Sequence, residues 1–363
     1  MGLFHYFFLF IFSIIRFTKI KIPKINFFFY ICTLPFLLLV LSDFFYNGIS
    51  GYPKMNGYFL SFLINISFFP LFFLIFSNHY IELAYKHINY KKLFVYSIRF
   101  LSIFGIVSWI IWHLTGRFIE IPFLTINGGD YLADYILKHI MRGENNIKLV
   151  STFNNGSIFG LCLLMFIPIY FYIEKKLTYK FILLLTIFLI FSRTLYVMFF
   201  IYIILIFILN RLNFKNLIYL IISLASFILI VILINYFSGY TNLMLFFHEP
   251  VRGKEFLMYY NEFSLFGNTF FQNISDVLYA GILYNYGIVG LIFFLLSLSS
   301  PLFVYFFIIR NDIKSSDYLI PIKDRLALGT LLYLIAANID NHFNAAPIML
   351  FYWFIISILF FKN

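Results

Sequence analysis

The chain has 363 residues, of which 63% are hydrophobic and 11% are charged, and its formal net charge is +11. Soluble domains contain about 25% charged and about 45–50% apolar residues. This composition excludes a water-soluble fold around one core, so lipid is the expected solvent. Lys and Arg gather in the cytoplasmic loops of membrane proteins, so the positive charge does not indicate a nucleic-acid partner.

The apolar runs predict an all-α, polytopic membrane protein with eleven transmembrane helices. A bilayer core about 30 Å thick needs roughly 20 apolar residues per helix. The run 277–309 is too long for one straight span and predicts either a tilted helix or a break near Gly287. No Gly/Ser linker or internal repeat divides residues 1–363, so a single transmembrane domain is expected. The predicted spans are 3–17, 25–43, 59–77, 93–113, 153–173, 179–192, 193–210, 217–238, 277–309, 326–340 and 346–361.

The distribution of positive charge predicts the orientation of these spans. With eleven alternating spans, 17 of the 26 Lys and Arg residues fall in one set of loops and 8 in the other, with Arg99 inside a span. The richer loops are short, which is where positive charge marks the cytoplasmic side. We therefore expect a periplasmic N-terminus and a cytoplasmic C-terminus. No cleavage site follows the first run, which favours a spanning helix over a signal peptide.

Two long segments, 114–152 and 239–276, are then predicted to be periplasmic. Loops of this length are usually functional or disordered, and neither segment has low complexity. The stretch from Asp130 to Met141 has a helical apolar period, which predicts an amphipathic helix at the outer interface.

Charged residues at membrane depth are costly and tend to serve function. Arg193 stands between two apolar runs with almost no loop around it. It is either a turn residue whose side chain reaches the headgroups or a phosphate-binding guanidinium at the mouth of a cavity. Arg252 is either a solvated loop charge or a second such group. Arg117 and Arg142, in the first long loop, are either solvated loop charges or further cationic groups for substrate binding. Lys254, in the second long loop, is another cationic candidate for substrate binding.

Polar residues at the ends of predicted spans form a second group of candidates. Asp276 could cap the helix that follows it, or abstract a proton at the rim of a cavity. His342 belongs to a polar knot from Asp340 to Asn344, which is either a tight turn or a substrate contact. Cys32 and Cys162 lie in apolar runs, and no metal-ligand or nucleotide-binding motif is present. We therefore expect no metal and no cofactor.

Several of these residues occur in an order that resembles the membrane family of O-antigen ligases and polymerases. That family carries an Arg, a Gly-containing turn about fifteen residues later, and a polar pair nine residues before G-x-x-G. The matching residues are Arg252, Ser264-Leu265-Phe266-Gly267, Asp276-Val277 and Gly287-Ile288-Val289-Gly290. Upstream, Thr152 to Ser157, including Asn155, and Ser192-Arg193-Thr194 are similar to two further family elements.

The resemblance implies a glycosyltransferase of the bacterial inner membrane with its active site facing the periplasm. It would join oligosaccharide repeat units carried on undecaprenyl pyrophosphate by metal-independent, inverting transfer. Arg193 and Arg252 would hold the pyrophosphate and Asp276 would orient or deprotonate the acceptor. The implied partners are lipid-linked glycans, membrane lipids and a chain-length regulator protein.

The chain departs from the family pattern at two positions, and two other functions compete with the polymerase. Ligases of the family typically have His where this chain has Asp276, which favours the polymerase, and the second Gly of the turn is replaced by Thr269. The nearest rival is an O-antigen ligase that transfers glycan to lipid A-core. A flippase for lipid-linked oligosaccharides is a rival of another class, with Arg99 as its one intramembrane charge.

Overall fold

The computed structural model describes residues 24–49, 60–73, 90–119, 121, 141–142, 146–153, 155–209, 264–267, 278–310, 320–338, 343 and 345–360. These residues are mostly helical, as predicted, and include one two-stranded hairpin. Contacts divide the chain into two compact units: unit 1 is Met1–Ile88 with Glu255–Asn363, and unit 2 is Asn89–Lys254. The expected single transmembrane domain stays a prediction. The spans predicted at 3–17 and 217–238 lie outside the described residues.

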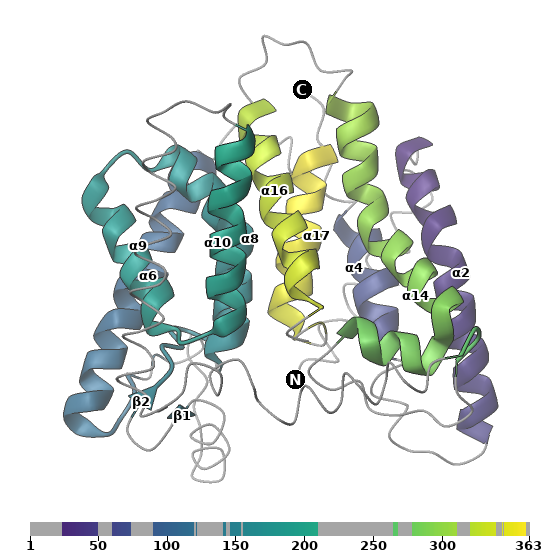
Figure 1. Cartoon of the computed structure of the whole chain (residues 1–363), viewed down its shortest axis with the longest axis horizontal. Coiled ribbons are helices and arrows are strands. Elements are labelled where there is room, and N and C mark those ends of the chain that lie inside the picture. Colours follow the sequence, from purple (N-terminus) through teal and green to yellow (C-terminus); the bar gives the residue numbers. More distant parts are fainter. Residues whose placement is uncertain are drawn as a thin grey trace. The chain divides into compact units, whose positions relative to one another are not determined.

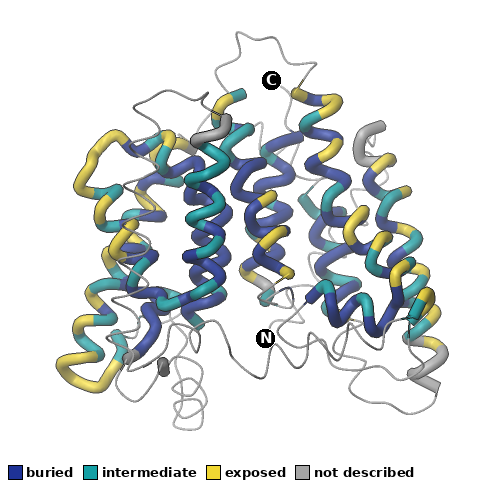
Figure 2. Tube along the Cα trace, in the orientation of Figure 1, coloured by how far each residue is buried: buried dark blue, intermediate teal, exposed yellow. Residues whose placement is uncertain are grey.

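The described part of unit 2 contains four helices and a short hairpin (Figure 1). Helix α6 packs against α8 and α9, and α10 packs against the same two helices. Helix α8 is buried along most of its length (Figure 2). The elements are α6 (Tyr90–Thr115), β1 (Met141–Arg142), β2 (Asn146–Ile147), α8 (Gly156–Ile173), α9 (Leu177–Leu189) and α10 (Arg193–Leu209).

Unit 1 combines helices from the beginning and the end of the chain. Helix α2 packs along α14, and α17 packs against α16, α4 and the π-helix η1. Aromatic rings of Phe36, Phe62 and Phe294 meet in its core, with centroids 5.0–6.2 Å apart. The elements are α2 (Lys24–Ile49), η1 (Leu63–Phe68), α4 (Phe69–Leu71), α14 (Leu278–Val304), η3 (Tyr305–Ile309), α16 (Ile320–Ala336) and α17 (Ala346–Phe360).

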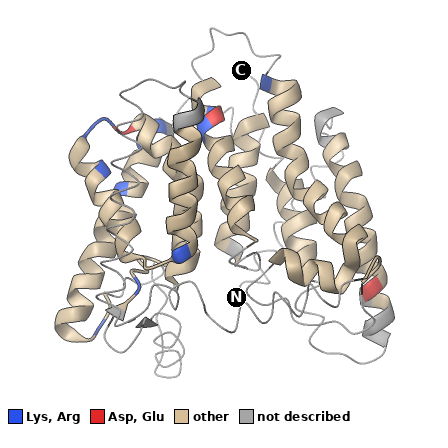
Figure 3. Ribbon diagram, viewed as in Figure 1, with Lys and Arg blue, Asp and Glu red and all other residues tan. Residues whose placement is uncertain are grey.

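Among the described residues, three helices are long and apolar enough to cross a membrane: Lys91–Thr115, Gly156–Ile173 and Leu278–Ile309. Helices α8, α14 and α17 contain no charged residue, and Figure 3 shows these long uncharged stretches. Helix α6 exposes an apolar side chain at every third or fourth position, which suits a lipid-facing surface. That stripe is Leu93, Tyr96, Phe100, Ile103, Val107, Ile110 and Leu114. The count of eleven and the orientation stay predictions.

The break predicted in the run 277–309 is present at Gly287. This residue has φ 70° and ψ −172° inside α14, so a short first arm ends there and a longer helix begins. The short arm runs crosswise to the rest of α14 (Figure 1). The amphipathic helix predicted over 130–141 lies outside the described residues except at Met141. That residue was expected to be helical and instead belongs to strand β1, paired with Ile147.

A second interruption, in the π-helix η1, follows from the position of Pro70. Phe69 donates its N–H to Ile64 O, so the carbonyl of Asn65 loses its α-helical partner. The next donor along the chain would be residue 70, but proline has no N–H. The indole Nε1 of Trp353 supplies the missing donor to Asn65 O at 2.6 Å. The widened turn therefore fixes α17 against η1 within unit 1.

The side chain of Asn65 extends this link to the connection between α16 and α17. Its Nδ2 donates to the Phe343 carbonyl at 2.8 Å and to Ser61 Oγ at 3.1 Å, and the residue is 3% exposed. Phe343 in turn packs on Phe62 and Phe294. One buried amide therefore ties a helix interruption to a chain connection some 280 residues away in sequence.

We predict that Trp353→Phe lowers the free energy of unfolding by about 1–3 kcal/mol, because the buried Asn65 carbonyl loses its indole donor. Thermal unfolding of the detergent-solubilised protein measures the effect. Trp112→Phe is a size-matched control in unit 2, where the ring is only partly buried. Equal losses from the two changes would contradict a specific role for the Trp353 bond.

Candidate functional site

A buried stretch of extended chain leads into helix α8 in unit 2. Residues 147–151 are all buried, although the predicted periplasmic loop 114–152 includes them. Trp109 Nε1 donates to the Ile147 carbonyl at 3.0 Å, and Ser151 Oγ donates to the Leu101 carbonyl at 2.7 Å. On the other side, the Leu149 N–H donates to the Leu189 carbonyl at 2.9 Å. The stretch therefore lies between α6 and the end of α9.

Lys148 places an ammonium group inside this end of the unit. It is 6% exposed, and its Nζ donates to Ser157 Oγ at 3.3 Å. The approach depends on Gly156, since a Cβ there would lie 2.9 Å from Lys148 Cβ and 3.0 Å from the Leu149 carbonyl. Lys148 is not among the residues predicted from the sequence, and the small pair Gly156-Ser157 that it contacts is the one local signal of its burial.

Helix α8 begins at the same place. Asn155 has extended backbone geometry and caps the helix, with its side-chain oxygen accepting the Ser157 N–H at 2.8 Å. The N-terminus of a helix carries a partial positive charge that favours anions. The predicted substrate-binding residue Asn155 thus has a structural role in forming a positive helix end beside Lys148.

Arg193 opens helix α10 immediately after the tight connection from α9. Ser192 caps this helix, because its Oγ accepts the Leu195 N–H at 3.4 Å and its carbonyl accepts the Tyr196 N–H at 3.1 Å. Arg193 is partly buried, and it begins α10 directly after the predicted hairpin at 192–194. Leu189, which bonds to Leu149, lies four residues earlier, so Arg193 and Lys148 share one end of unit 2.

Two residues in the left-handed region of the backbone mark the same end. Ser151 has φ 54° and Phe191 has φ 50°. A non-glycine residue in this region costs about 1–2 kcal/mol and persists only where the surroundings hold it. Such residues concentrate at functional sites, which supports this end of unit 2 as the candidate site.

Two other described candidates, Arg117 and Arg142, lie near the same end of unit 2. Arg117 follows α6, is exposed, and donates its backbone N–H to Thr115 Oγ1 at 3.3 Å. Arg142 pairs with Asn146 in the hairpin that leads to Ile147. Four predicted residues therefore gather at one end of unit 2: Asn155, Arg193, Arg117 and Arg142. The predicted residues Arg252, Asp276, Lys254 and His342 lie outside the described residues.

The G-x-x-G element forms a second locus, in unit 1. The turn Ser264 to Gly267 docks on the break in α14, with Ser264 and Leu265 carbonyls accepting the N–H groups of Ile288 and Val289 at 3.2 Å. A Cβ on Gly287 would lie 2.3 Å from the Leu265 carbonyl, and one on Gly267 would lie 2.1 Å from the Asn285 carbonyl. The two sequence elements quoted for the family resemblance therefore touch each other, and Asp276 lies two residues before the described start of α14.

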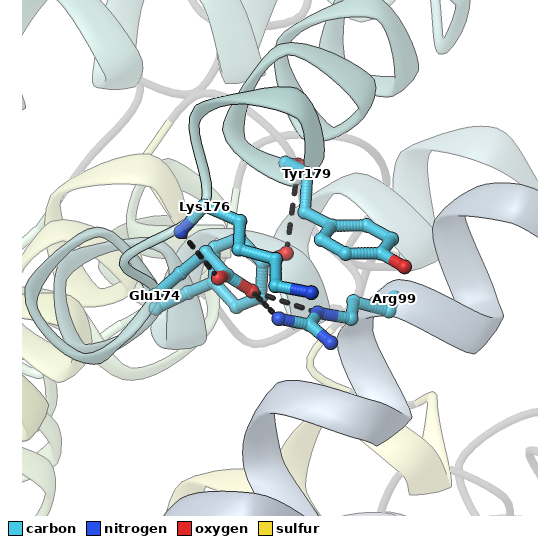
Figure 4. A network of polar contacts seen from close by, with 5 residues as sticks. Arg99, Glu174, Lys176 and Tyr179 are labelled. Atoms are coloured by element: carbon cyan, nitrogen blue, oxygen red, sulfur yellow. Dashed lines mark hydrogen bonds and ion pairs between the residues drawn. The ribbon is translucent and has the colours of Figure 1, made fainter.

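Arg99, the one charge predicted inside a span, belongs to an ion pair at the opposite end of unit 2 (Figure 4). Its Nε and Nη2 lie 2.7 Å from Glu174 Oε2, and its guanidinium lies 3.8 Å from the centroid of the Tyr179 ring. Glu174 Oε1 accepts the Lys176 N–H at 2.8 Å. This pair joins α6 to the connection between α8 and α9, which gives Arg99 a structural explanation.

These contacts lower the pKa of the Glu174 carboxyl. Burial by itself raises its pKa, but the Lys176 N–H and the Arg99 guanidinium outweigh that effect and hold the pKa below its ordinary value. The group is therefore ionised in the folded protein near neutral pH.

The described residues contain no group of three or more His, Cys, Asp and Glu side chains placed to hold a metal ion. Comparison of the chain with protein-family models, with curated proteins and with solved structures gives no match.

We predict that Gly287→Ala destabilises unit 1 far more than Gly116→Ala destabilises unit 2. Both glycines have φ 70°, but a Cβ on Gly116 meets nothing within 4 Å, whereas one on Gly287 meets backbone atoms. The control should lose about 1–2 kcal/mol for the left-handed backbone alone, and Gly287→Ala should lose several more because main chain must move. Thermal melting of the two variants compares them, and similar losses would contradict the docked turn.

We predict that Glu174→Gln lowers the free energy of unfolding near neutral pH by about 2 kcal/mol, since a charged, hydrogen-bonded group is lost. The lowered pKa makes this stabilisation present above the ordinary glutamate pKa and lost as the pH falls through the folded value. The difference from the unaltered protein should therefore shrink in acid, as measured by melting across a pH series. Asp324→Asn is the control, because Asp324 is 28% exposed in its pair with Arg310. A difference that stays constant with pH would contradict this role.

Proposed function

We propose that this chain is a polysaccharide polymerase that joins lipid-linked oligosaccharide repeat units at the periplasmic face of the bacterial inner membrane. The observation that carries the proposal is the positive end of unit 2. There Lys148 and Arg193 lie at the same end of the unit as the N-termini of α8 and α10. A membrane-embedded site of this kind suits a ligand with a pyrophosphate group and a long apolar tail.

The proposed reaction needs positive charge beside its leaving group. The bond between the anomeric carbon of the donor glycan and the pyrophosphate oxygen breaks, and an acceptor hydroxyl oxygen forms the new bond to that carbon. Undecaprenyl pyrophosphate leaves with the bonding electron pair, so negative charge grows on its oxygen. Fixed cations and helix ends that face this oxygen stabilise the transition state more than the ground state.

Each of four residues has its own role in the proposed reaction. Arg193 binds the pyrophosphate bidentately, which a guanidinium does better than an ammonium. Lys148 adds a point charge. Its position is fixed by the hydrogen bond from Nζ to Ser157 and by the close approach of Lys148 to Gly156. Arg252 is proposed as a second phosphate ligand, and Asp276 accepts the proton of the acceptor hydroxyl. The proposals for Arg252 and Asp276 rest on the family resemblance.

The pairing of Arg99 with Glu174 weakens the case for a transporter, because the one predicted intramembrane charge has a structural partner near a helix end. A ligase would use the same donor and the same leaving group. Deletion of the gene separates the two activities, since loss of a polymerase leaves a single repeat unit on the lipid A-core and loss of a ligase leaves bare core.

We predict that Arg193→Gln abolishes long-chain glycan, while Arg193→Lys retains a small part of it because one charge remains without the planar fork. Gel banding of surface polysaccharide from cells that carry each variant measures chain length. Membrane insertion is checked by the amount of protein in the membrane fraction.

Arg310→Gln is the matched control, since it removes one Arg charge from the pair with Asp324 in unit 1 and should leave banding unchanged. Normal banding from Arg193→Gln would exclude Arg193 from the reaction. Loss of banding from both variants would show a general response to lost charge.

A further inference from the structure

The connection between α8 and α9 presents charge and apolar surface side by side. Lys175 and Lys176 are exposed, and Lys180 is partly exposed one turn further along. Leu177 and Phe181, between and beside them, are 81% and 66% exposed. We call these five residues the basic turn. It lies at the opposite end of unit 2 from Arg193, so it is separate from the proposed catalytic site.

The ion pair beneath holds the basic turn in a defined shape. Glu174 ends α8 and accepts the Lys176 N–H, which fixes the start of α9. Arg99 binds the same carboxylate and stacks on Tyr179, whose ring also lies 5.9 Å from Lys176 Nζ. Figure 4 shows Lys176 extending past this network. The carboxylate at this turn is thus engaged by Arg99 and does not neutralise the exposed lysines.

Helix α6 adds two more lysines on the same side. Lys91 and Lys92 are exposed and lie about two helical turns before Arg99, towards the beginning of α6. Because Arg99 bonds to the residue that ends α8, the start of α6 and the basic turn share one end of unit 2. Next to them on α6, Leu93 and Tyr96 are 50% and 60% exposed. The mixture of positive and apolar surface therefore spans two helices.

We propose that the basic turn binds an anionic phospholipid. Its phosphate lies among Lys175, Lys176 and Lys180, and its acyl chains lie against Leu177 and Phe181. An acidic protein would satisfy the lysines but leave the large apolar side chains in water. A zwitterionic lipid would cover the apolar side chains without a net charge for the lysines. An anionic lipid satisfies both, and positive segments beside membrane helices attract such lipids through the charge of each Lys or Arg.

The test uses the purified full chain in an uncharged detergent. Phosphatidylglycerol or phosphatidylcholine with identical acyl chains is added, and retained lipid is measured by native mass spectrometry alongside the melting temperature. The unaltered chain should bind phosphatidylglycerol in preference, and added salt should reduce that preference. Equal binding of the two lipids would overturn the proposal.

The variant K175Q/K176Q/K180Q should bind phosphatidylglycerol at least about tenfold more weakly, because three headgroup charges are lost. The matched variant K175R/K176R/K180R keeps the charge and should keep the preference. A glutamine variant that retains the preference would overturn the proposal, and the salt dependence of the unaltered chain decides the matter if that variant does not fold.

Two further measurements separate the headgroup from the acyl chains. L177Q/F181Q should weaken the binding of both lipids while keeping the preference for phosphatidylglycerol. Glycerophosphoglycerol, which has the headgroup but no acyl chains, should leave the melting temperature unchanged. Stabilisation by this soluble compound as strong as that by the lipid would overturn the proposed role of Leu177 and Phe181.

Discussion

Hydrocarbon offers no hydrogen-bond partner, so each N–H and C=O group of a chain in lipid must find one within the protein. A continuous helix satisfies this constraint by itself, and an interrupted one needs help from elsewhere. Three interruptions are satisfied here by distant segments. The Ser264 to Gly267 turn caps the second arm of α14, Trp353 bonds to the carbonyl that Pro70 leaves free, and Leu189 and Trp109 bond to the stretch before α8.

These interruptions are also where chemistry-bearing residues are found. The stretch before α8 carries Lys148 into a buried position that a regular loop would not reach. The docked turn brings the two glycine elements of the family resemblance into contact at Gly287. A helix break frees backbone groups and directs side chains away from the helix axis, so it can build a site that a straight span cannot. The uninterrupted helices, such as α8 and α10, supply rigid positive ends beside these sites.

Local patterns in the sequence predict several of these features. The length of the run 277–309 and its glycine predict the break in α14, and Ser192-Arg193-Thr194 between two apolar runs predicts the α9–α10 hairpin. Both depend on neighbouring residues only. The role of Asn65 and the burial of Lys148 were missed, because each depends on a partner far away in sequence or across the unit: Trp353 and Phe343 for Asn65, and the α6–α9 packing for the stretch before α8.

The sequence by itself determined the class of protein, since no water-soluble core could hold so many apolar residues, and it determined where most described helices begin and end. It also singled out Arg193 and the glycine elements as residues of interest. Only the tertiary structure decided that Arg99 is a partner of Glu174, and that Lys148 lies beside the capped end of α8. The physical reason is that helix formation follows from nearby side chains and bilayer thickness, whereas the partner of a buried charge depends on which helices pack together.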